Sequence, residues 1–256
     1  MEFAYLSDIT GDRKYLKAVE KVREVVATAE RPKTLYPNYL NPKTGKWGQQ
    51  HTSVGALGDS FYEYLLKEWL RSGKRDKEAK RLFDEAALDI EKQLVKHSSS
   101  GLTYIAEYKY GRTEDKMDHL ACFAGNYATL AKNKGSNLLG IILNWPLVVY
   151  GCRTYFIPLG GMYGLAAHEE KDENSANWMN IAAGITNTCH ESYDRTDTKL
   201  GPEAFRFSNA MEARALKQNE RYYILRPETF EAYFIMWRLT HEQKYRDWAW
   251  EAIQVS

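Results

Sequence analysis

Two acids and one guanidinium surround a predicted helix start in the segment 225–231, which reads LRPETFE. Proline fixes φ and lacks an amide hydrogen, so Pro227 suits the first turn of a helix. Glu228 then falls where the helix dipole favours a carboxylate, and Glu231 follows on the same face. We expect the Arg226 guanidinium, just before this turn, to reach either acid. The segment is therefore either part of a catalytic or sugar-binding site or a well-capped helix start with solvated charges.

A second pair of acids lies in the segment 55–64, which reads GALGDSFYEY. Aspartate is a poor helix former, so Asp59 inside a helical pattern suggests that its carboxylate has a task. Glu63 follows at i+4 on the same face. Glycoside hydrolysis needs one carboxyl as acid and another as base, held about 6.5–9.5 Å apart in inverting enzymes. The alternative is an ordinary helix-start acid beside Gly55 and Gly58.

Two further polar groups could belong to the same kind of site. Asp118 and His119 precede an apolar run and are expected at a helix start, where the imidazole either binds a sugar hydroxyl or is buried in the core. Glu203 follows Pro202 and repeats the Pro-Glu pair. Several carboxylates together with 13% aromatic residues are typical of carbohydrate chemistry, although an ordinary helical core is also rich in aromatics.

The composition of the chain limits the kinds of molecule that it can be expected to bind. The chain has 256 residues, enough for a large single domain, and its 35 basic and 34 acidic residues give a net charge of +1. This balance excludes strong electrostatic attraction to nucleic acid or to an anionic membrane. The three cysteines fit no zinc spacing. No signal peptide precedes the first helical pattern, so we expect the chain to be internal to a longer protein.

Apolar residues recur at helical spacing over most of the chain. The periodicity predicts helices at about 15–29, 54–70, 77–96, 175–193, 228–240 and 243–255. The segment 102–109 is predicted as a strand, and 110–116 as its hairpin partner.

A weak internal repeat links three of the predicted helix ends. The segments 5–15, 69–79 and 237–245 each end one helix, turn tightly and start another, which predicts αα-hairpins. Repeated αα-hairpins form a solenoid or a closed α/α barrel whose inner helices line a cavity. The helices that carry Asp59 and Glu228 both precede such a turn. We therefore expect both acids in the inner ring, facing one cavity.

The segment 126–159 matches none of its surroundings. It contains the apolar run 138–151, which is interrupted by Asn144 and Pro146. This run is shorter than the about 20 apolar residues that a membrane-spanning helix needs. A buried helix or hairpin is the simpler interpretation of the run.

Long strings of the chain resemble the class I α-1,2-mannosidases, glycoside hydrolase family 47, which trim high-mannose N-glycans. They are YPNYLNPKTGKWGQQHTSVGALGDSFYEYLLKEWL, GLTYIAEY, KMDHLACFAG, TCHESYDRT, LGPEAFRF and LRPETFEAYFIMWRLT. The resemblance covers the chain from Glu2 to about Ala252, apart from the unmatched segment. It implies an inverting, calcium-dependent glycosidase. The implied fold is an all-α, incomplete (α/α)7 barrel, an αα-hairpin toroid with a short β-hairpin, and residues 1–256 form one partial catalytic domain.

The resemblance assigns roles to individual residues. Asp59 matches the catalytic aspartate of the family, and Glu228 matches its catalytic glutamate, the expected general base. Cys122 and Cys189 match its disulfide pair, which implies an oxidising lumen. Leu57 stands where the endoplasmic-reticulum enzyme has arginine, as in the Golgi-type subgroup. Residues expected to line the sugar sites or the calcium water shell are Arg226, Glu231, Glu203, Asp118, His119, Glu63 and Glu2.

The chain departs from the family pattern in three places, and these departures limit the activity expected of it. The remaining catalytic acid is expected upstream of Met1, and the Thr-Glu pair that binds calcium is expected beyond Ser256, so no direct metal ligand is expected in this chain. The family string CFAGGM is split here, which indicates an insertion at 126–159 that also contains Cys152. We therefore expect the chain alone to be inactive.

The expected parent protein is a Golgi-type, membrane-anchored enzyme that removes terminal α-1,2-linked mannose from N-glycans on the lumenal side. Two alternatives belong to other classes: a non-catalytic, mannosidase-like glycan-binding protein, and an α-helical scaffold whose acids are only solvated.

Overall fold

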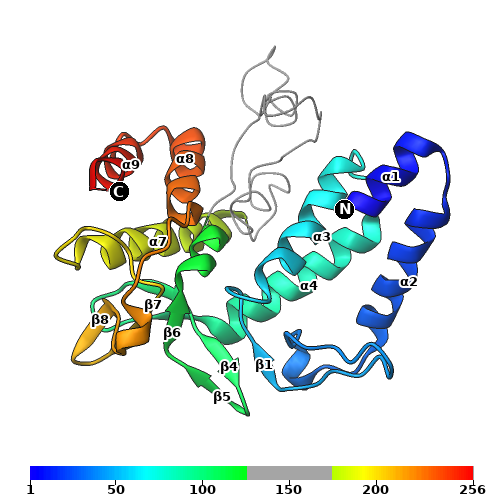
Figure 1. Cartoon of the computed structure of the whole chain (residues 1–256), viewed down its shortest axis with the longest axis horizontal. Helices are drawn as coiled ribbons and strands as arrows, with labels where there is room; N and C mark the ends of the chain where they lie inside the picture. The colour runs from blue at the N-terminus through cyan, green and yellow to red at the C-terminus, as the bar shows by residue number, and fades with distance from the viewer. Residues whose placement is uncertain (126–174, 256) are drawn as a thin grey trace. The chain divides into compact units, whose positions relative to one another are not determined.

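A computed structural model describes residues 1–125 and 175–255, which are mainly helical with three small sheets (Figure 1). Backbone contacts divide the chain into two compact units. The first comprises Met1–Val95 with Ala106–Glu114, and the second comprises Lys96–Ile105 with Asp115–Ser256. The expected insertion at 126–159, with Cys152, lies outside the described residues.

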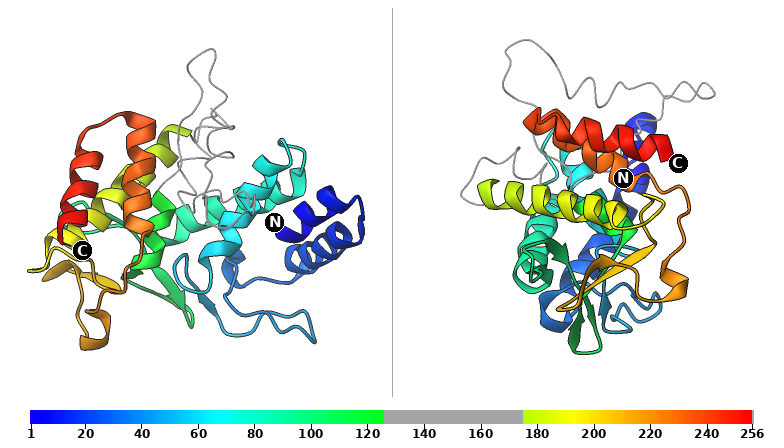
Figure 2. Two further views of the ribbon diagram at one scale, coloured as in Figure 1. Left: turned by 45° about the horizontal axis from the view of Figure 1, so that its top comes forward. Right: turned by 90° about the vertical axis from the view of Figure 1, so that its left-hand side faces the viewer.

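Two αα-hairpins form the helical part of the first unit. α1 (Glu2–Thr10) turns at Gly11, whose φ is +71°, into α2 (Lys14–Thr28). α3 (Asp59–Arg71) leads through a second tight turn into α4 (Lys77–Leu94). Figures 1 and 2 show both antiparallel pairs. The hairpins predicted at 5–15 and 69–79 are thus confirmed. The core side chains of α3 and α4 include Tyr62, Leu65, Leu66, Leu82, Phe83, Ala86 and Ile90.

The start of α3 is set by a close backbone contact. A Cβ at Gly58 would lie 2.0 Å from the carbonyl oxygen of Ser53, so only glycine fits there. Leu57, just before it, has a φ of 75°, which is outside the helical region. The helix predicted from residue 54 therefore begins only at Asp59.

A three-stranded antiparallel sheet completes the first unit. Its order is β1 (His51–Thr52), β4 (Glu107–Lys109) and β5 (Arg112–Glu114). β4 and β5 are joined by Tyr110 and Gly111, whose φ values of 47° and 88° match the two left-handed positions of a tight hairpin turn. The predicted hairpin is confirmed, but the strand predicted over 102–109 is not continuous.

In the described part of the second unit, three helices form the core. α7 (Ser175–Asp194) packs against α8 (Glu228–Thr240), and α8 forms the third αα-hairpin with α9 (Lys244–Val255). The turn between α8 and α9 has His241 in the left-handed region, with a φ of 57°. The hairpin predicted at 237–245 is confirmed. The buried core between these helices consists of Ala182, Ala232, Tyr233, Met236 and Tyr245.

Two small sheets accompany these helices. β2 (Val95–His97) pairs with β3 (Thr103–Ile105), so the helix predicted to residue 96 ends at Leu94, where β-branched Val95 starts a strand. The other sheet has the order β6-β7-β8 and was not predicted. Its strands are β6 (Lys116–Asp118), β7 (Ala204–Ser208) and β8 (Met211–Arg214). The described chain is therefore less purely helical than expected.

The described residues also contain three short 3₁₀ helices and a disulfide bond. The 3₁₀ helices are η1 (Pro32–Thr34), η2 (His119–Gly125) and η3 (Gln218–Glu220). A disulfide joins Cys122 in η2 to Cys189 in α7, with the two Cα atoms 5.9 Å apart. The cysteine pairing expected from the family resemblance is confirmed.

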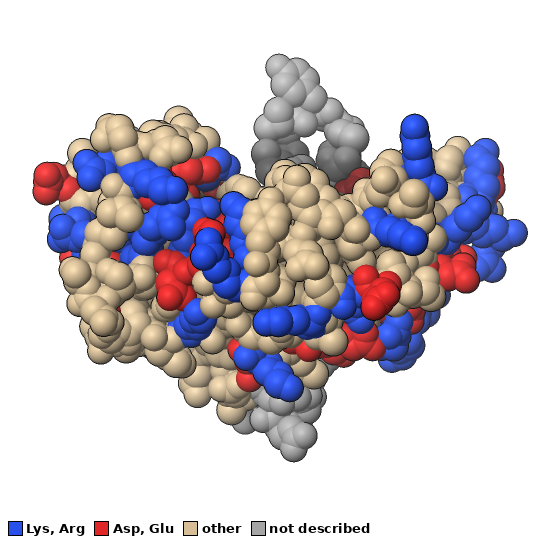
Figure 3. Space-filling model, turned by 90° about the horizontal axis from the view of Figure 1, so that it is seen from below, with Lys and Arg blue, Asp and Glu red and all other residues tan. Residues whose placement is uncertain are grey.

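The surface carries charges of both signs. On the face drawn in Figure 3, Lys and Arg side chains are interspersed with Asp and Glu and with uncharged residues. This mixture agrees with the near-zero net charge. Within the described ranges, none of the helices has the length and apolarity required to cross a bilayer.

Candidate active site

Glu228 occupies the start of α8, as the sequence predicts. Pro227 is the N-cap residue, and its carbonyl oxygen accepts a hydrogen bond from the Glu231 amide at 2.9 Å. The Glu228 side chain is 19% exposed, and its Oε2 is buried. Glu231 lies one turn further along α8 and is half-buried.

Arg226 forms a bidentate ion pair, but not with the acids of α8. Its Nε and one terminal nitrogen donate to the two carboxylate oxygens of Glu203 at 2.8 and 2.7 Å. The Glu203 carboxylate raises the pKa of Arg226 through these bonds. The Glu203 amide in turn donates to the carbonyl oxygen of Tyr222 at 3.0 Å, which holds the two segments together. The hydrogen bonds of Arg226 thus go to Glu203, while the charge of Glu228 also raises the pKa of Arg226.

His119 is the buried centre of this cluster, with 1% of its surface exposed. Its Nε2 lies 2.6 Å from the Tyr193 hydroxyl and 3.4 Å from the Thr229 hydroxyl. Its Nδ1 lies 3.6 Å from Oε2 of Glu228. Within the described ranges, neither Nδ1 nor Oε2 has a hydrogen-bond partner. His119 therefore links Tyr193 to the candidate base.

The hydrogen bonds around His119 favour one tautomer. Burial raises the pKa of Tyr193, so its hydroxyl stays protonated and can donate to Nε2. The proton of the neutral imidazole then resides on Nδ1, which faces Glu228. A carboxylate accepts hydrogen bonds only, so this arrangement gives Nδ1–H a suitable neighbour.

Backbone hydrogen bonds hold Asp118 and His119 beside Glu203. Asp118 ends β6 opposite Ala204 of β7, and the next amide, that of His119, donates to the Glu203 carbonyl oxygen at 2.9 Å. The Asp118 carboxylate lies 3.4 Å from Nζ of Lys116. Asp118 thus precedes a 3₁₀ helix at the end of a strand, close to the helix start that was expected. The second unit brings together Asp118, His119, Glu203, Arg226 and Glu228.

The other expected site residues lie in the first unit. Asp59 is the first residue of α3, and its carboxylate accepts the Ser60 amide at 2.8 Å. Glu63 is buried one turn later and pairs with Lys67. Burial raises the pKa of Glu63, Lys67 opposes this shift, and Asp59 adds to it by charge repulsion.

Glu2 and Leu57 also belong to the first unit. The side chain of Glu2 hydrogen-bonds to Tyr64. Leu57 is 66% exposed, so its side chain is available for contact. Asp59 and Glu228 belong to different units, and the cavity that they are expected to share stays a prediction.

Comparison with known proteins identifies the family. The profile of glycosyl hydrolase family 47 matches residues 1–255. The chain belongs to glycosyl hydrolase family 47.

Named relatives within family 47 are closely similar over almost the whole chain. Mannosyl-oligosaccharide alpha-1,2-mannosidase IA of Drosophila melanogaster is 53% identical over 99% of this chain and 33% of its own length. Mannosyl-oligosaccharide 1,2-alpha-mannosidase IB of Homo sapiens is 48% identical over 98% of this chain and 34% of its own length. The human endoplasmic reticulum mannosyl-oligosaccharide 1,2-alpha-mannosidase is 32% identical over 99% of this chain and 32% of its own length. The chain thus spans about a third of the length of these relatives.

A solved structure has a similar fold. The alpha-1,2-mannosidase from Trichoderma reesei matches with a TM-score of 0.69 and 24% identity, over 99% of this chain and 49% of that one. At this identity the likeness concerns the fold alone. It agrees with the mainly helical structure described above.

Sequence reasoning missed three residues that contact the expected site residues within each unit. Tyr193 and Thr229 contact His119, and Lys67 pairs with Glu63. Tyr193 lies within TCHESYDRT, one of the strings that carried the resemblance, so this string held the signal. For Lys67, the signal was a lysine at a position that the helical periodicity of α3 places on the buried face.

The described side chains form no cluster of metal ligands. In residues 1–125 and 175–255, no three or more His, Cys, Asp or Glu side chains are grouped to hold a metal ion. The described side chains therefore do not fit direct coordination of calcium.

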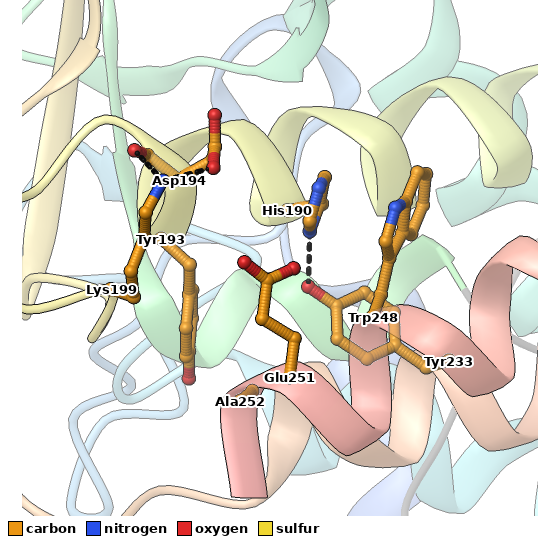
Figure 4. Close-up of a pocket in the computed structure, with 8 residues that line it drawn as sticks. All are labelled: His190, Tyr193, Asp194, Lys199, Tyr233, Trp248, Glu251 and Ala252. Atoms are coloured by element: carbon orange, nitrogen blue, oxygen red, sulfur yellow. Dashed lines mark hydrogen bonds and ion pairs between the residues drawn. The ribbon is translucent and has the colours of Figure 1, made fainter. Parts of the chain in front are cut away.

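A small cavity beside α7 and α9 is lined by Tyr193 but by none of the expected catalytic acids. Its volume is about 10 Å³, room for one water molecule. His190 of α7 lies on its wall, stacked on Trp248 of α9 with ring centroids 4.0 Å apart (Figure 4). Nδ1 of His190 lies 3.3 Å from the Tyr233 hydroxyl. The cavity is lined by none of the expected sugar-site residues and is too small for a sugar.

Proposed function

We propose that the protein containing this chain is a mannosyl-oligosaccharide 1,2-α-mannosidase that removes terminal α-1,2-linked mannose from high-mannose N-glycans. The observation that carries the proposal is the family 47 match over residues 1–255, with relatives of this name that match nearly the whole chain. The cluster of Glu228, His119 and Tyr193 gives the proposal a chemical basis.

Glu228 acts as the general base in this proposal. Its partly exposed carboxylate takes a proton from the water that attacks the anomeric carbon. His119 faces the carboxylate with Nδ1 at 3.6 Å from Oε2, and Tyr193 keeps the imidazole in the tautomer that places its proton on this side. Asp59 serves as a second catalytic carboxylate. A separation of about 6.5–9.5 Å between acid and base would admit the water and invert the anomeric configuration.

The remaining polar residues bind the sugar. The Arg226–Glu203 pair presents a fixed guanidinium and carboxylate to sugar hydroxyls, and Asp118, Glu231, Glu63 and Glu2 supply further acceptors. The exposed Leu57 borders the substrate and distinguishes the chain from the arginine-bearing type of enzyme. Calcium dependence is carried over from the family as an expectation.

We also infer that the chain is part of an (α/α)7 barrel. Three αα-hairpins support this fold, as does the likeness to a mannosidase structure twice as long. A groove of about 420 Å³ along α8 and α9 exposes Phe234, Trp250 and Ile253, which are 46%, 62% and 55% exposed. Further helices of the barrel would cover this apolar surface.

The proposed location is the Golgi lumen, with the full protein anchored in the membrane. The disulfide between Cys122 and Cys189 supports an oxidising compartment. The higher identity to the IA and IB enzymes than to the endoplasmic-reticulum enzyme supports the Golgi subgroup.

The test is mannose release from a high-mannose oligosaccharide by the full protein that contains this chain. Proton NMR identifies the anomer released first, which we expect to be β. Glu228→Gln should lower kcat by at least about 100-fold, the usual effect of a catalytic acid or base. Glu191→Gln, which alters an acid on α7 that pairs with Arg195, should leave kcat unchanged. Absence of release, or release that Glu228→Gln does not alter, would overturn the proposal.

The 256-residue chain by itself is proposed to be inactive. Its coverage of about a third of the relatives supports this narrower proposal. Calcium-dependent release of mannose by the purified chain would contradict it. Binding of mannose-terminated glycans by the full protein without turnover would instead indicate a lectin.

A further inference from the structure

One face of α3 carries a row of three charged side chains. Asp59, Glu63 and Lys67 follow one another at intervals of four residues, so each lies about one turn from the next. Asp59 begins the helix, and Lys67 lies deep in its second half. The row thus runs from the candidate active site into the core of the first unit.

The burial of Lys67 is unusual for its residue type. The side chains of Lys67 and Glu63 are 4% and 6% exposed, and Nζ of Lys67 contacts Oε1 of Glu63. Lysine is almost never fully buried unless it is paired, because removing an ammonium from water is costly. Leucine or methionine would fill this position at lower cost if packing were its only task. The position therefore indicates that a positive charge is required.

The charges that face Glu63 explain this requirement. Burial raises the pKa of its carboxyl group, and the carboxylates of Asp59 and Glu2 raise it further. Lys67 opposes these effects through its charge and its hydrogen bond. Without the ammonium, the pKa of Glu63 would rise further, and the electrostatic field at Asp59 would change.

We propose that Lys67 is a positioning residue whose buried ammonium keeps the Glu63 carboxylate charged and fixed beside Asp59. This inference rests on the proposed function, because that function makes Asp59 and Glu63 active-site acids. Lys67 itself pairs with Glu63 in the buried part of α3. It acts on the reaction only through the acid that it holds.

The first test is a carboxyl ¹³C NMR titration of the 256-residue chain without substrate. In Lys67→Met we expect the titration midpoint of Glu63 to rise by about one pH unit or more, a tenfold change in proton affinity. Lys67→Arg should restore the midpoint. Lys80→Met is the matched control, because Lys80 forms an i,i+4 pair with Asp84 on α4. It should leave Glu63 and Asp59 unchanged.

Coupling to Asp59 distinguishes positioning from a purely structural ion pair. In the wild-type chain, the Asp59 resonance should show a second step at the Glu63 midpoint, and this step should move with that midpoint in Lys67→Met. An unchanged Glu63 midpoint, or an Asp59 resonance without this step, would overturn the proposal. A wild-type Asp59 resonance without this step overturns the proposal even if Lys67→Met does not fold.

The full protein gives the second test. Lys67→Met should move the acid limb of the kcat/KM pH profile to higher pH, and Lys67→Arg should move it back. A lower thermal midpoint with an unchanged pH profile would reduce Lys67 to a structural role and overturn the proposal. Failure of the full protein to release mannose, with the NMR coupling intact, would count against the proposed function alone.

Discussion

At the scale of single residues, the site depends on buried polar contacts that sequence spacing does not reveal. Pro227 and Glu228 lie at a helix start as predicted, because their local preferences decide that position. Arg226 pairs with Glu203 instead of its near neighbours, because β-pairing and loop contacts bring residue 203 alongside. Local spacing therefore predicts where a helix starts better than it predicts the partners of its side chains.

Removal of the Tyr193 hydroxyl should affect His119 directly. Tyr193→Phe deletes the 2.6 Å contact to Nε2 and leaves a buried imidazole nitrogen with the weaker 3.4 Å contact to Thr229. We expect a loss of about 1–3 kcal/mol in the free energy of unfolding, measured by urea denaturation. Tyr222→Phe is the control, since Tyr222 is 48% exposed and should change this free energy by less than about 0.5 kcal/mol. Equal stability of the two variants would show that the His119 contact is not formed.

At the scale of elements, helical periodicity and turn chemistry predicted most of what forms. All three αα-hairpins and the β4–β5 hairpin agree with the sequence, because local residue preferences specify them. The sheet of β6, β7 and β8 was missed because its pairing joins segments distant in sequence. The alternation in β7 was its weak local signal. The start of α3 was misplaced because the contact at Gly58 is tertiary.

The position at which α3 begins can be tested by substitution of Gly58. Gly58→Ala would place a Cβ 2.0 Å from the Ser53 carbonyl oxygen, which is backbone and cannot move aside easily. We expect a loss of about 1–3 kcal/mol in the free energy of unfolding. At Gly48 an added Cβ would meet its nearest atoms at 3.5 Å, an ordinary contact, so Gly48→Ala should be much less costly. If the two alanine variants unfold at the same urea concentration, α3 does not begin as described.

The packing of α7 on α9 should depend on pH through His190. Burial lowers the pKa of His190, and the net shift stays downward although nearby acids oppose it. The folded-state pKa of His190 lies below its unfolded value of about 6.5. The contribution of the neutral imidazole to the free energy of unfolding is therefore fully present above pH 6.5 and is lost as the pH falls through the folded-state pKa. His190→Phe should lose this dependence while keeping the stacking on Trp248. The test is the thermal unfolding midpoint of wild type and His190→Phe, measured from pH 7.5 to 5. Parallel plots of this midpoint against pH for the two proteins would contradict the prediction. The charged groups that act on His190 are Asp194, Glu251, Glu191 and Lys199.

At the scale of the whole molecule, sequence resemblance supplied what periodicity could not. The hairpin repeat left a solenoid and a closed barrel as alternatives, and the family match then identified the class of fold and chemistry. Which acids share a cavity depends on the relative placement of the two units, which no local pattern determines. The disulfide is the long-range link that the resemblance predicted and the structure contains.

The disulfide should therefore dominate the stability of the second unit. It closes a loop between residues separated by 67 positions, for which chain entropy gives a stabilisation of about 4 kcal/mol. The Cys122→Ser/Cys189→Ser variant should lose about that much, and a reducing agent should lower the wild-type thermal midpoint without lowering that of the variant. Both proteins are best compared in a Cys152→Ser background, so that a third thiol cannot exchange. Equal midpoints with and without reductant would show that the bond does not form in solution, and would remove the main support for an oxidising compartment.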